Sequence, residues 1–253
     1  MTREISQRRS GAVLELRFNR PDRKNAITPA MYAALADGLR SAEADEDILV
    51  VTLSGSEGIF TAGNDLRDFQ ETSTPDSERP VAHFLQAIST FPKVIVAGVS
   101  GPAVGVGTTM LLHCDLVLAA PSALFSLPFV DLGLVPEAAS SLLLPRLIGH
   151  QRAAKHLILG DPFDAETALL YGLVAEIVDE EALDVRVREI AGRIAAKPPE
   201  AVRLTKKLLR DGSSAVAERI GQESALFGER LRSPEAAEAF AAFFEKRPPN
   251  FKR

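Results

Sequence analysis

Two strongly apolar segments, each followed by a turn of small residues, constrain the fold of this chain most. Residues 48–53 lead to the stretch FTAGNDL at residues 60–66, and residues 94–99 run directly into SGPAVGVG at residues 100–107. Small side chains leave backbone N–H groups uncovered, and Gly63 permits the backbone angles that a sharp turn needs. Two such turns at the ends of two strands predict two amide donors directed at one oxygen, as in an oxyanion hole.

The rest of the chain alternates between strand and helix patterns and then becomes helical. Thr28 followed by Pro29 is typical of a helix start. Repeated strand–helix–strand units favour parallel strands and an α/β fold. The expected strands are residues 13–18, 48–53, 94–99, 115–119 and 175–178. The first expected helix begins at residue 29. Further helices are expected at residues 81–90, 107–113, 140–148, 151–159 and 165–171, and the chain is expected to be helical from about residue 180 onward.

Polar or proline-rich segments interrupt this pattern at three places. Residues 72–80 carry two prolines among polar residues, and we interpret them as a mobile loop over a site, with a solvated connector as the alternative. The helical end is interrupted by Pro198-Pro199 and by Asp211-Gly212, which predict helix boundaries.

The composition excludes several classes of protein. With 29 Lys and Arg against 34 Asp and Glu, the formal net charge is −5, which argues against a general nucleic-acid-binding surface. Cys114 is the single cysteine, so no disulfide within the chain is expected. No apolar run reaches about 18 residues, and the N-terminus lacks an apolar signal segment. We expect a cytoplasmic protein without nucleic-acid or membrane partners.

Other patterns that resemble sites have simpler explanations. Gly105 and Gly107 follow a strand, but Met110 stands where a dinucleotide-binding turn has its third glycine. Cys114 lies in an apolar segment without a basic neighbour to activate the thiol, so we interpret it as a core residue. No metal site is expected, because no histidine is spaced with acids as metal ligands are. The four histidines are His83, His113, His150 and His156.

Glu137 is an isolated acid between small and apolar residues. It follows Val135 and Pro136 and precedes Ala138 and Ala139. One interpretation is a carboxylate at a helix N-terminus, where the helix dipole favours negative charge. The other is a base for proton transfer, since removal from water raises the pKa of a carboxyl toward neutrality. The residue pattern alone leaves both interpretations open.

The two glycine turns and several shorter segments together resemble the crotonase family, the enoyl-CoA hydratases and isomerases. The matching segments are residues 60–66, 100–107, 114–115, 133–136, 171–174 and 243–248. The ordered set covers nearly the whole chain. The resemblance implies an α/β fold with a spiral core of β–β–α turns over residues 1–197. It also implies a C-terminal helical region at residues 198–253 that forms homotrimers, often paired into homohexamers.

By this resemblance, the substrate is an acyl-CoA whose thioester oxygen accepts hydrogen bonds from the amides of Asn64 and Val106. No separate cofactor is implied, because coenzyme A enters as part of the substrate. Phe243 and Lys246 are expected to reach this ligand from the C-terminal tail of the same or a neighbouring subunit. The other residues expected against the adenine and pantetheine parts are Lys24, Ala26, Ala62, Asp65 and Leu66.

Two positions depart from the hydratases of that family. Where a hydratase carries two glutamates that activate water, this chain has Thr109 and Phe129, and neither can move a proton. Glu137 stands where a branch similar to peroxisomal-type 3-enoyl-CoA isomerases keeps its single catalytic glutamate. We therefore expect isomerisation of 3-enoyl-CoA to trans-2-enoyl-CoA with one base. The alternatives are a hydratase or other family reaction in which Glu137 activates water, and an acyl-CoA-binding protein without catalysis.

Overall fold

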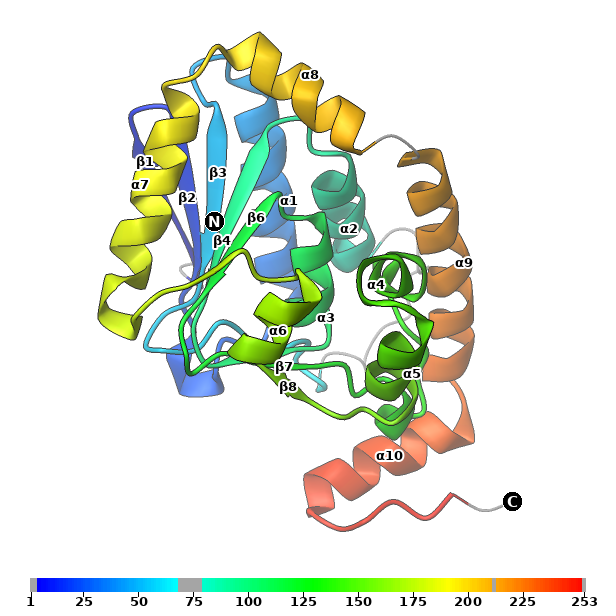
Figure 1. Cartoon of the computed structure of the whole chain (residues 1–253). Helices are drawn as coiled ribbons and strands as arrows, with labels where there is room; N and C mark the ends of the chain where they lie inside the picture. The colour runs from blue at the N-terminus through cyan, green and yellow to red at the C-terminus, as the bar shows by residue number, and fades with distance from the viewer. Residues whose placement is uncertain (1–3, 68–78, 211–212, 252–253) are drawn as a thin grey trace.

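The computed structural model describes residues 4–67, 79–210 and 213–251 and contains two β-sheets surrounded by helices (Figure 1). The larger sheet has the strand order β1-β2-β3-β4-β6-β9, and the smaller sheet has the order β5-β7-β8. The strands of the larger sheet are β1 (Ile5–Ser10), β2 (Val13–Phe18), β3 (Val50–Ser54), β4 (Val94–Val99), β6 (Leu116–Ala119) and β9 (Glu176–Ile177). Those of the smaller sheet are β5 (Pro102–Val104), β7 (Leu124–Ser126) and β8 (Phe163–Asp164).

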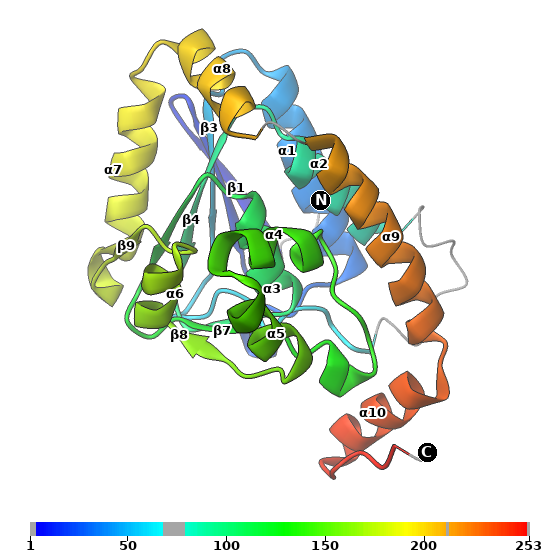
Figure 2. The same ribbon diagram turned by 45° about the vertical axis from the view of Figure 1, so that its right-hand side comes forward.

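The helices divide into those that cover the sheets and those of the C-terminal region. The first group is α1 (Pro29–Ala44), α2 (Pro80–Thr90), α3 (Val106–Thr109), α4 (Ser140–Ile148), α5 (His150–Ile158), α6 (Ala165–Tyr171) and α7 (Leu183–Ala195). The second group is α8 (Pro199–Leu209), α9 (Ser213–Leu231) and α10 (Pro234–Glu245). Short 3-10 helices are η1 (Pro21–Arg23), η4 (Met110–His113), η5 (Val130–Leu132) and η6 (Glu180–Ala182). Helix α9 lies against α2 and α4 (Figures 1 and 2). Helix α10 follows α9 and contacts η5.

The larger sheet is parallel except at β1, which pairs antiparallel with β2. Successive side chains of a strand face opposite sides of the sheet, and a parallel sheet covered on both sides needs apolar residues on both. One face packs against α7 through Val50, Val96, Leu118 and the helix residues Leu183 and Val187. The other face packs against α1 and α2 through Leu16, Val51, Leu53, Ile95 and Val99.

Most of the predicted elements are confirmed, and so is the α/β fold class with a helical C-terminal region. The strands at residues 13–18 and 94–99 and the helices at residues 140–148 and 165–171 have the predicted bounds. The helix predicted at residues 107–113 is divided into α3 and η4, and the other predicted elements shift by at most two residues. Thr28 is the N-cap of α1, as expected.

The sequence does not predict β1 or the smaller sheet. Five of the six residues of β1 are exposed, so this strand has no apolar alternation, and strands of two or three residues show no pattern at all. The predicted boundary at Pro198-Pro199 separates α7 from α8. The boundary at Asp211-Gly212, and the loop predicted at residues 72–80 up to residue 78, lie outside the described residues. The division of the chain at residue 197 stays an interpretation.

Within the described ranges, no helix combines the length and apolarity that crossing a bilayer requires.

A buried ion pair fastens α8 to the larger sheet. Lys206 Nζ donates to Asp115 Oδ2 at 2.7 Å and to Lys93 O at 2.5 Å. Asp115 Oδ2 also accepts from Ile95 N–H at 2.8 Å, and Arg210 Nη2 lies 3.4 Å from Asp115 Oδ1. Removing one partner of such a pair leaves the other charge buried and unpaired. This lowers the free energy of unfolding far more than the loss of an exposed pair does.

We expect Asp115→Asn to lower the free energy of unfolding by about 3 kcal/mol, because Lys206 loses its counter-charge while it remains buried. Urea unfolding followed by circular dichroism measures this. The matched control is Glu200→Gln, which breaks an exposed pair with Arg203 on the same helix and should cost less than about 0.5 kcal/mol. Equal effects of the two changes would contradict this account of how α8 is held.

Candidate active site

The structure brings the two predicted glycine turns side by side. Thr61 N–H donates to Pro102 O at 2.9 Å, and Val104 N–H donates to Thr61 O at 3.0 Å. The first turn is thereby paired in parallel with β5. Gly63 has a φ of 84°, and a Cβ atom at this position would stand 2.6 Å from Val104 O. A residue without a side chain is required for this close approach.

The amide of Asn64 differs from the amides on either side of it. Gly63 N–H donates to Thr61 Oγ1 at 3.1 Å, and Asp65 N–H donates to Ile27 O at 3.0 Å. Among the described residues, no acceptor lies within hydrogen-bond distance of Asn64 N–H. The turn is therefore held on both sides of one uncommitted donor.

The second turn ends in a helix start, which also leaves amides uncommitted. Val106 is the first residue of α3, and the first N–H groups of a helix have no partner within it. The preceding Gly105 has φ 55° and ψ −116°, a conformation that requires glycine. Its own N–H donates to Ser126 O at 2.9 Å. The free amides of Asn64 and Val106 agree with the oxyanion hole expected from the sequence, which stays a prediction.

Glu137 is buried and one of its oxygens is unpaired. The residue is 7% exposed, and Oε1 has no hydrogen-bond partner within the described part of the chain. Burial raises the pKa of its carboxyl to about 8, with a further contribution from the negative charge of Glu223. A carboxyl with this pKa is about one-tenth ionised at pH 7, and in its ionised form it binds a proton strongly, as a general base should.

The backbone after Glu137 is strained and is held from two sides. Ala138 and Ala139 have φ values of 59° and 57°, a region that costs a non-glycine residue about 1–2 kcal/mol. His113 Nε2 lies 2.8 Å from Ala138 O, and because a carbonyl only accepts, this nitrogen carries the hydrogen. Burial lowers the pKa of His113 to about 4, so the ring is neutral. From the other side, Ala139 N–H donates to Glu223 Oε2 at 2.6 Å.

Tyr32 joins the first turn to the neighbourhood of Glu137. Its hydroxyl donates a short hydrogen bond to Asn64 Oδ1. Burial, and then the charge of Glu137, raise the pKa of the Tyr32 hydroxyl, so it remains a neutral donor. The ring packs on Phe84 with 5.5 Å between centroids. Tyr32 thus fixes the side chain of the residue whose amide is free.

The positions of the two hydratase glutamates are occupied by buried side chains without acidic groups. Thr109 lies in α3, where its Oγ1 donates to Val106 O at 3.4 Å. Phe129 lies beside the second turn, since a Cβ atom at Gly105 would stand 3.9 Å from its ring. Neither Thr109 nor Phe129 can transfer a proton. Among the described residues at the site, this leaves the carboxyl of Glu137 as the candidate for that role.

The residues predicted to contact coenzyme A lie mostly around the first turn. Lys24 has a φ of 51°, and its carbonyl accepts from Ala62 N–H at 2.9 Å. The carboxylate of Asp65 accepts from Arg20 Nη1 at 2.8 Å, so this side chain anchors the turn. Lys24 is exposed, and the half-buried members of the group are Ala26, Ala62, Asp65 and Leu66. Their contact with coenzyme A stays a prediction.

Phe243 and Lys246 lie apart from these residues at the end of α10. Phe243 is 59% exposed and its described ring contact is with Phe244. Lys246 ends the helix with a φ of 55° and is exposed. Their expected approach to an acyl-CoA is not seen within this single chain and stays a prediction.

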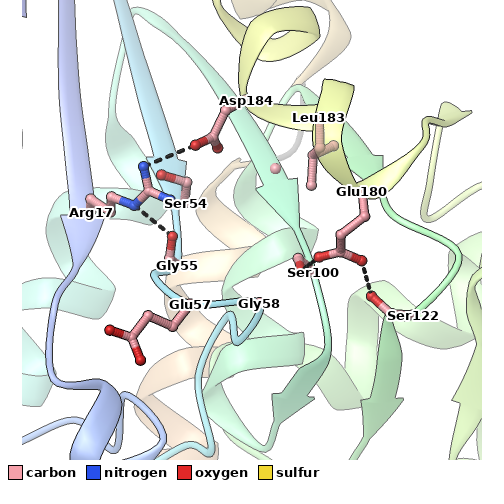
Figure 3. Close-up of a pocket in the computed structure, with 11 residues that line it drawn as sticks. Arg17, Ser54, Gly55, Glu57, Gly58, Ser100, Ser122, Glu180, Leu183 and Asp184 are labelled. Atoms are coloured by element: carbon pink, nitrogen blue, oxygen red, sulfur yellow. Dashed lines mark hydrogen bonds and ion pairs between the residues drawn. The ribbon is translucent and has the colours of Figure 1, made fainter.

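A separate cavity of about 500 Å³ lies between the ends of the central strands and the start of α7 (Figure 3). Arg17 bridges Asp184 at 2.9 Å and donates to Gly55 O at 2.7 Å. Glu180 accepts from the hydroxyls of Ser100 and Ser122. These polar groups satisfy one another, and none of the predicted site residues lines this cavity. In the described ranges, no three His, Cys, Asp or Glu side chains are grouped as metal ligands.

Tyr32 and Glu223 are the site residues that sequence reasoning missed. Tyr32 belongs to the apolar side of α1, where a buried hydroxyl needs a partner. Glu223 falls on the apolar side of α9, in register with Ile220, Phe227 and Leu231. An acid on an otherwise apolar helix face is the sequence signal by which Glu223 could have been identified. The sequence neighbours of Glu137 carry no charge, but the folded chain places the carboxylate of Glu223, from α9, close enough to raise the pKa of Glu137.

Comparisons with known proteins agree on one family. A sequence profile of the family described as enoyl-CoA hydratase/isomerase matches residues 8–253. Enoyl-CoA delta isomerase 2 of Rattus norvegicus is 33% identical over 245 residues, which are 94% of this chain and 62% of the rat protein. The chain thus spans less than two thirds of that relative. The 1,2-epoxyphenylacetyl-CoA isomerase of Escherichia coli is 33% identical over 94% of each chain.

Further relatives show that reactions differ within this group. The 2,3-dehydroadipyl-CoA hydratase of Escherichia coli is 31% identical over 98% of each chain. The crystal structure of an enoyl-CoA hydratase/isomerase from Pseudoalteromonas atlantica has a TM-score of 0.94 and 43% identity, covering 99% of this chain and 100% of the other.

We expect Glu137→Gln to remove part of the pH dependence of stability. The folded protein holds the Glu137 proton up to about pH 8, whereas the unfolded chain releases it near pH 4.5. The folded state is therefore destabilised as pH rises through this window, by about 1.4 kcal/mol per pKa unit. Urea unfolding at pH 5 and pH 8 should show the variant gaining a few kcal/mol over the wild type at pH 8 only. A constant difference between the two proteins would contradict the raised pKa.

Proposed function

This chain belongs to the enoyl-CoA hydratase/isomerase family, and we propose that it converts a 3-enoyl-CoA to the trans-2-enoyl-CoA. The observation that carries the proposal is the buried carboxyl of Glu137, with an unpaired oxygen, in a site where the two hydratase positions hold Thr109 and Phe129. Moving a double bond by one position requires one base that accepts a proton at one carbon and returns it at another.

The proposed reaction proceeds through a dienolate. The ionised Glu137 takes the proton from C2, and the electron pair of the broken C–H bond moves onto the thioester oxygen. The amides of Asn64 and Val106 donate to this oxygen and stabilise its charge. Glu137 then returns the proton at C4, which leaves the double bond between C2 and C3. Only a proton moves, so the reaction needs neither an oxidant nor a reductant, and coenzyme A serves as part of the substrate.

Hydration is the rival reaction, and one of the relatives is named as a hydratase. Addition of water needs a group that holds and deprotonates the water and an acid that protonates the α-carbon. Thr109 and Phe129 offer neither, so Glu137 would have to serve both steps alone. The third alternative is binding of an acyl-CoA without catalysis. The buried carboxyl of Glu137, with its unpaired oxygen, argues against this alternative. A spectrophotometric assay of the wild type with 3-enoyl-CoA and 2-enoyl-CoA separates the three.

The proposal includes an assembly of homotrimers or homohexamers and keeps the cytoplasmic location expected from the sequence. Apolar side chains of the C-terminal helices support the assembly, since Leu208 is 77% and Leu209 is 82% exposed. Leu204 and Leu226 are exposed as well. Phe240, which the sequence pattern of the C-terminal helices also assigns in part to an interface, is instead buried within its own chain, in the apolar cluster that includes Phe129 and Leu134.

We expect Glu137→Gln to lower kcat of the isomerase by about 10³-fold or more, at the upper end of general acid–base effects, because the amide cannot accept a proton. Binding of an acyl-CoA, measured by isothermal titration calorimetry, should be retained. The control is Asp131→Asn, an exposed acid on η5, which should leave the rate within about twofold. If Glu137→Gln kept more than about a tenth of the rate, the assignment of the base would be wrong.

We expect the purified protein to run as a trimer or hexamer in light scattering at micromolar concentration, because exposed apolar surface of this extent favours association. Leu208→Glu together with Leu209→Glu should shift the mass toward that of one chain. A wild type that stays monomeric under these conditions would count against the proposed assembly.

A further inference from the structure

The N-terminus of α4 would stabilise the carboxylate of Glu137, which comes directly after Pro136 in the chain. Helix α4 has nine residues, and its N-cap Ala139 has no side-chain acceptor. The first amides of such a helix lack partners and attract negative charge. Glu137 lies only two residues before this cap. Its side chain is therefore long enough to turn back and accept hydrogen bonds from these amides.

A different carboxylate occupies these amides. Glu223, from the middle of α9, accepts from Ala139 N–H through Oε2 at 2.6 Å and from Ser141 N–H through Oε1 at 2.9 Å. Arg219, one turn earlier on α9, donates to Ser141 Oγ at 3.1 Å. Glu223 is 4% exposed. Its position is thus set by α9 and by both hydrogen bonds to α4.

We propose that Glu223 is a positioning residue that keeps Glu137 out of the N-terminus of α4, so that the Glu137 carboxylate stays unpaired and faces the site. The unpaired Oε1 of Glu137 is the second observation behind this proposal. Two carboxylates cannot share one pair of amides, and the one on α9 holds them. The same two bonds stabilise the left-handed backbone of Ala138 and Ala139, which sets the direction in which the Glu137 side chain leaves the chain.

Without Glu223, Glu137 should turn back and cap its own helix. A carboxylate that accepts backbone N–H bonds at a helix start is a weak base, so the site would lose its proton acceptor while its shape survived. The charged or titratable groups that face this region are Tyr32 on α1, His113 on η4, and Arg219 and Glu223 on α9. Tyr32 and His113 are neutral, and the positive charge of Arg219 favours the ionised form of Glu223. The exchange at the amides therefore concerns the two carboxylates.

A thermal-unfolding cycle at pH 8 tests the proposal without any assay of activity. Glu137→Gln should raise the melting temperature when residue 223 is Glu, because it removes an unpaired buried charge. The same change in a Glu223→Gln background should lower the melting temperature, because it then removes a capping carboxylate. An equal effect of Glu137→Gln in the two backgrounds would overturn the proposal.

If Glu223→Gln does not fold, Glu223→Asp provides the second cycle. It keeps the charge but shortens the side chain, so it should hold one amide at most, and the stabilising effect of Glu137→Gln should shrink. An unchanged effect in the Asp background would again overturn the proposal.

The activity measurements rest on the proposed isomerase function. Glu223→Gln should lower kcat by about tenfold to a hundredfold, with KM within about threefold, and move the rising limb of the pH–rate profile down by about one unit. The control Glu218→Gln, an exposed position on α9, should change none of these. An unaltered kcat and pH profile in Glu223→Gln would exclude the positioning role. A wild type without isomerase activity would refute the proposed function alone, since the unfolding cycle stands independently.

Discussion

Two buried carboxylates meet at the N-terminus of α4, and the pairing of one leaves the other free. Glu223 accepts from Ala139 N–H and Ser141 N–H, and Glu137 keeps an unpaired oxygen in a buried position. A buried ionised group without partners is costly, so this arrangement raises the pKa of the Glu137 carboxyl to about 8. The unpaired, buried carboxylate of Glu137 lowers the stability of the fold. For the same reason it is more basic than an ordinary carboxylate, as the proposed proton transfer requires.

This arrangement depends on the docking of the C-terminal helices. Helix α9 lies along α2 and α4 (Figure 2), and α8 is fastened to the larger sheet by Lys206 and Asp115. The C-terminal region therefore affects the pKa of a buried carboxyl in the core. The two carboxylates involved are Glu137, which precedes α4, and Glu223 on α9, and they are far apart in the chain.

The proposed oxyanion hole depends on backbone pairing instead. The first turn is joined to β5 through Thr61, and the second turn enters α3 at Val106. Both amides belong to backbone held by strands, so their direction does not rely on mobile side chains. In the proposed reaction, donors fixed in advance in this way would need no reorganisation as charge develops on the thioester oxygen. Tyr32 adds a single side-chain contact, to Asn64.

By itself, the sequence determined the order of the helices and of the larger-sheet strands from β2 onward, the two glycine turns, and the isolation of Glu137 among apolar neighbours in the chain. These features are local, because they follow from periodicity, from glycine conformation and from the residues beside an acid. Only the tertiary structure decided that Asn64 meets Tyr32, that the short strands form a second sheet, and that Glu223 takes the amides next to Glu137. Each of these contacts joins residues distant in the chain, and an acid on the apolar side of α9 gives no sign of which helix end it will pair with.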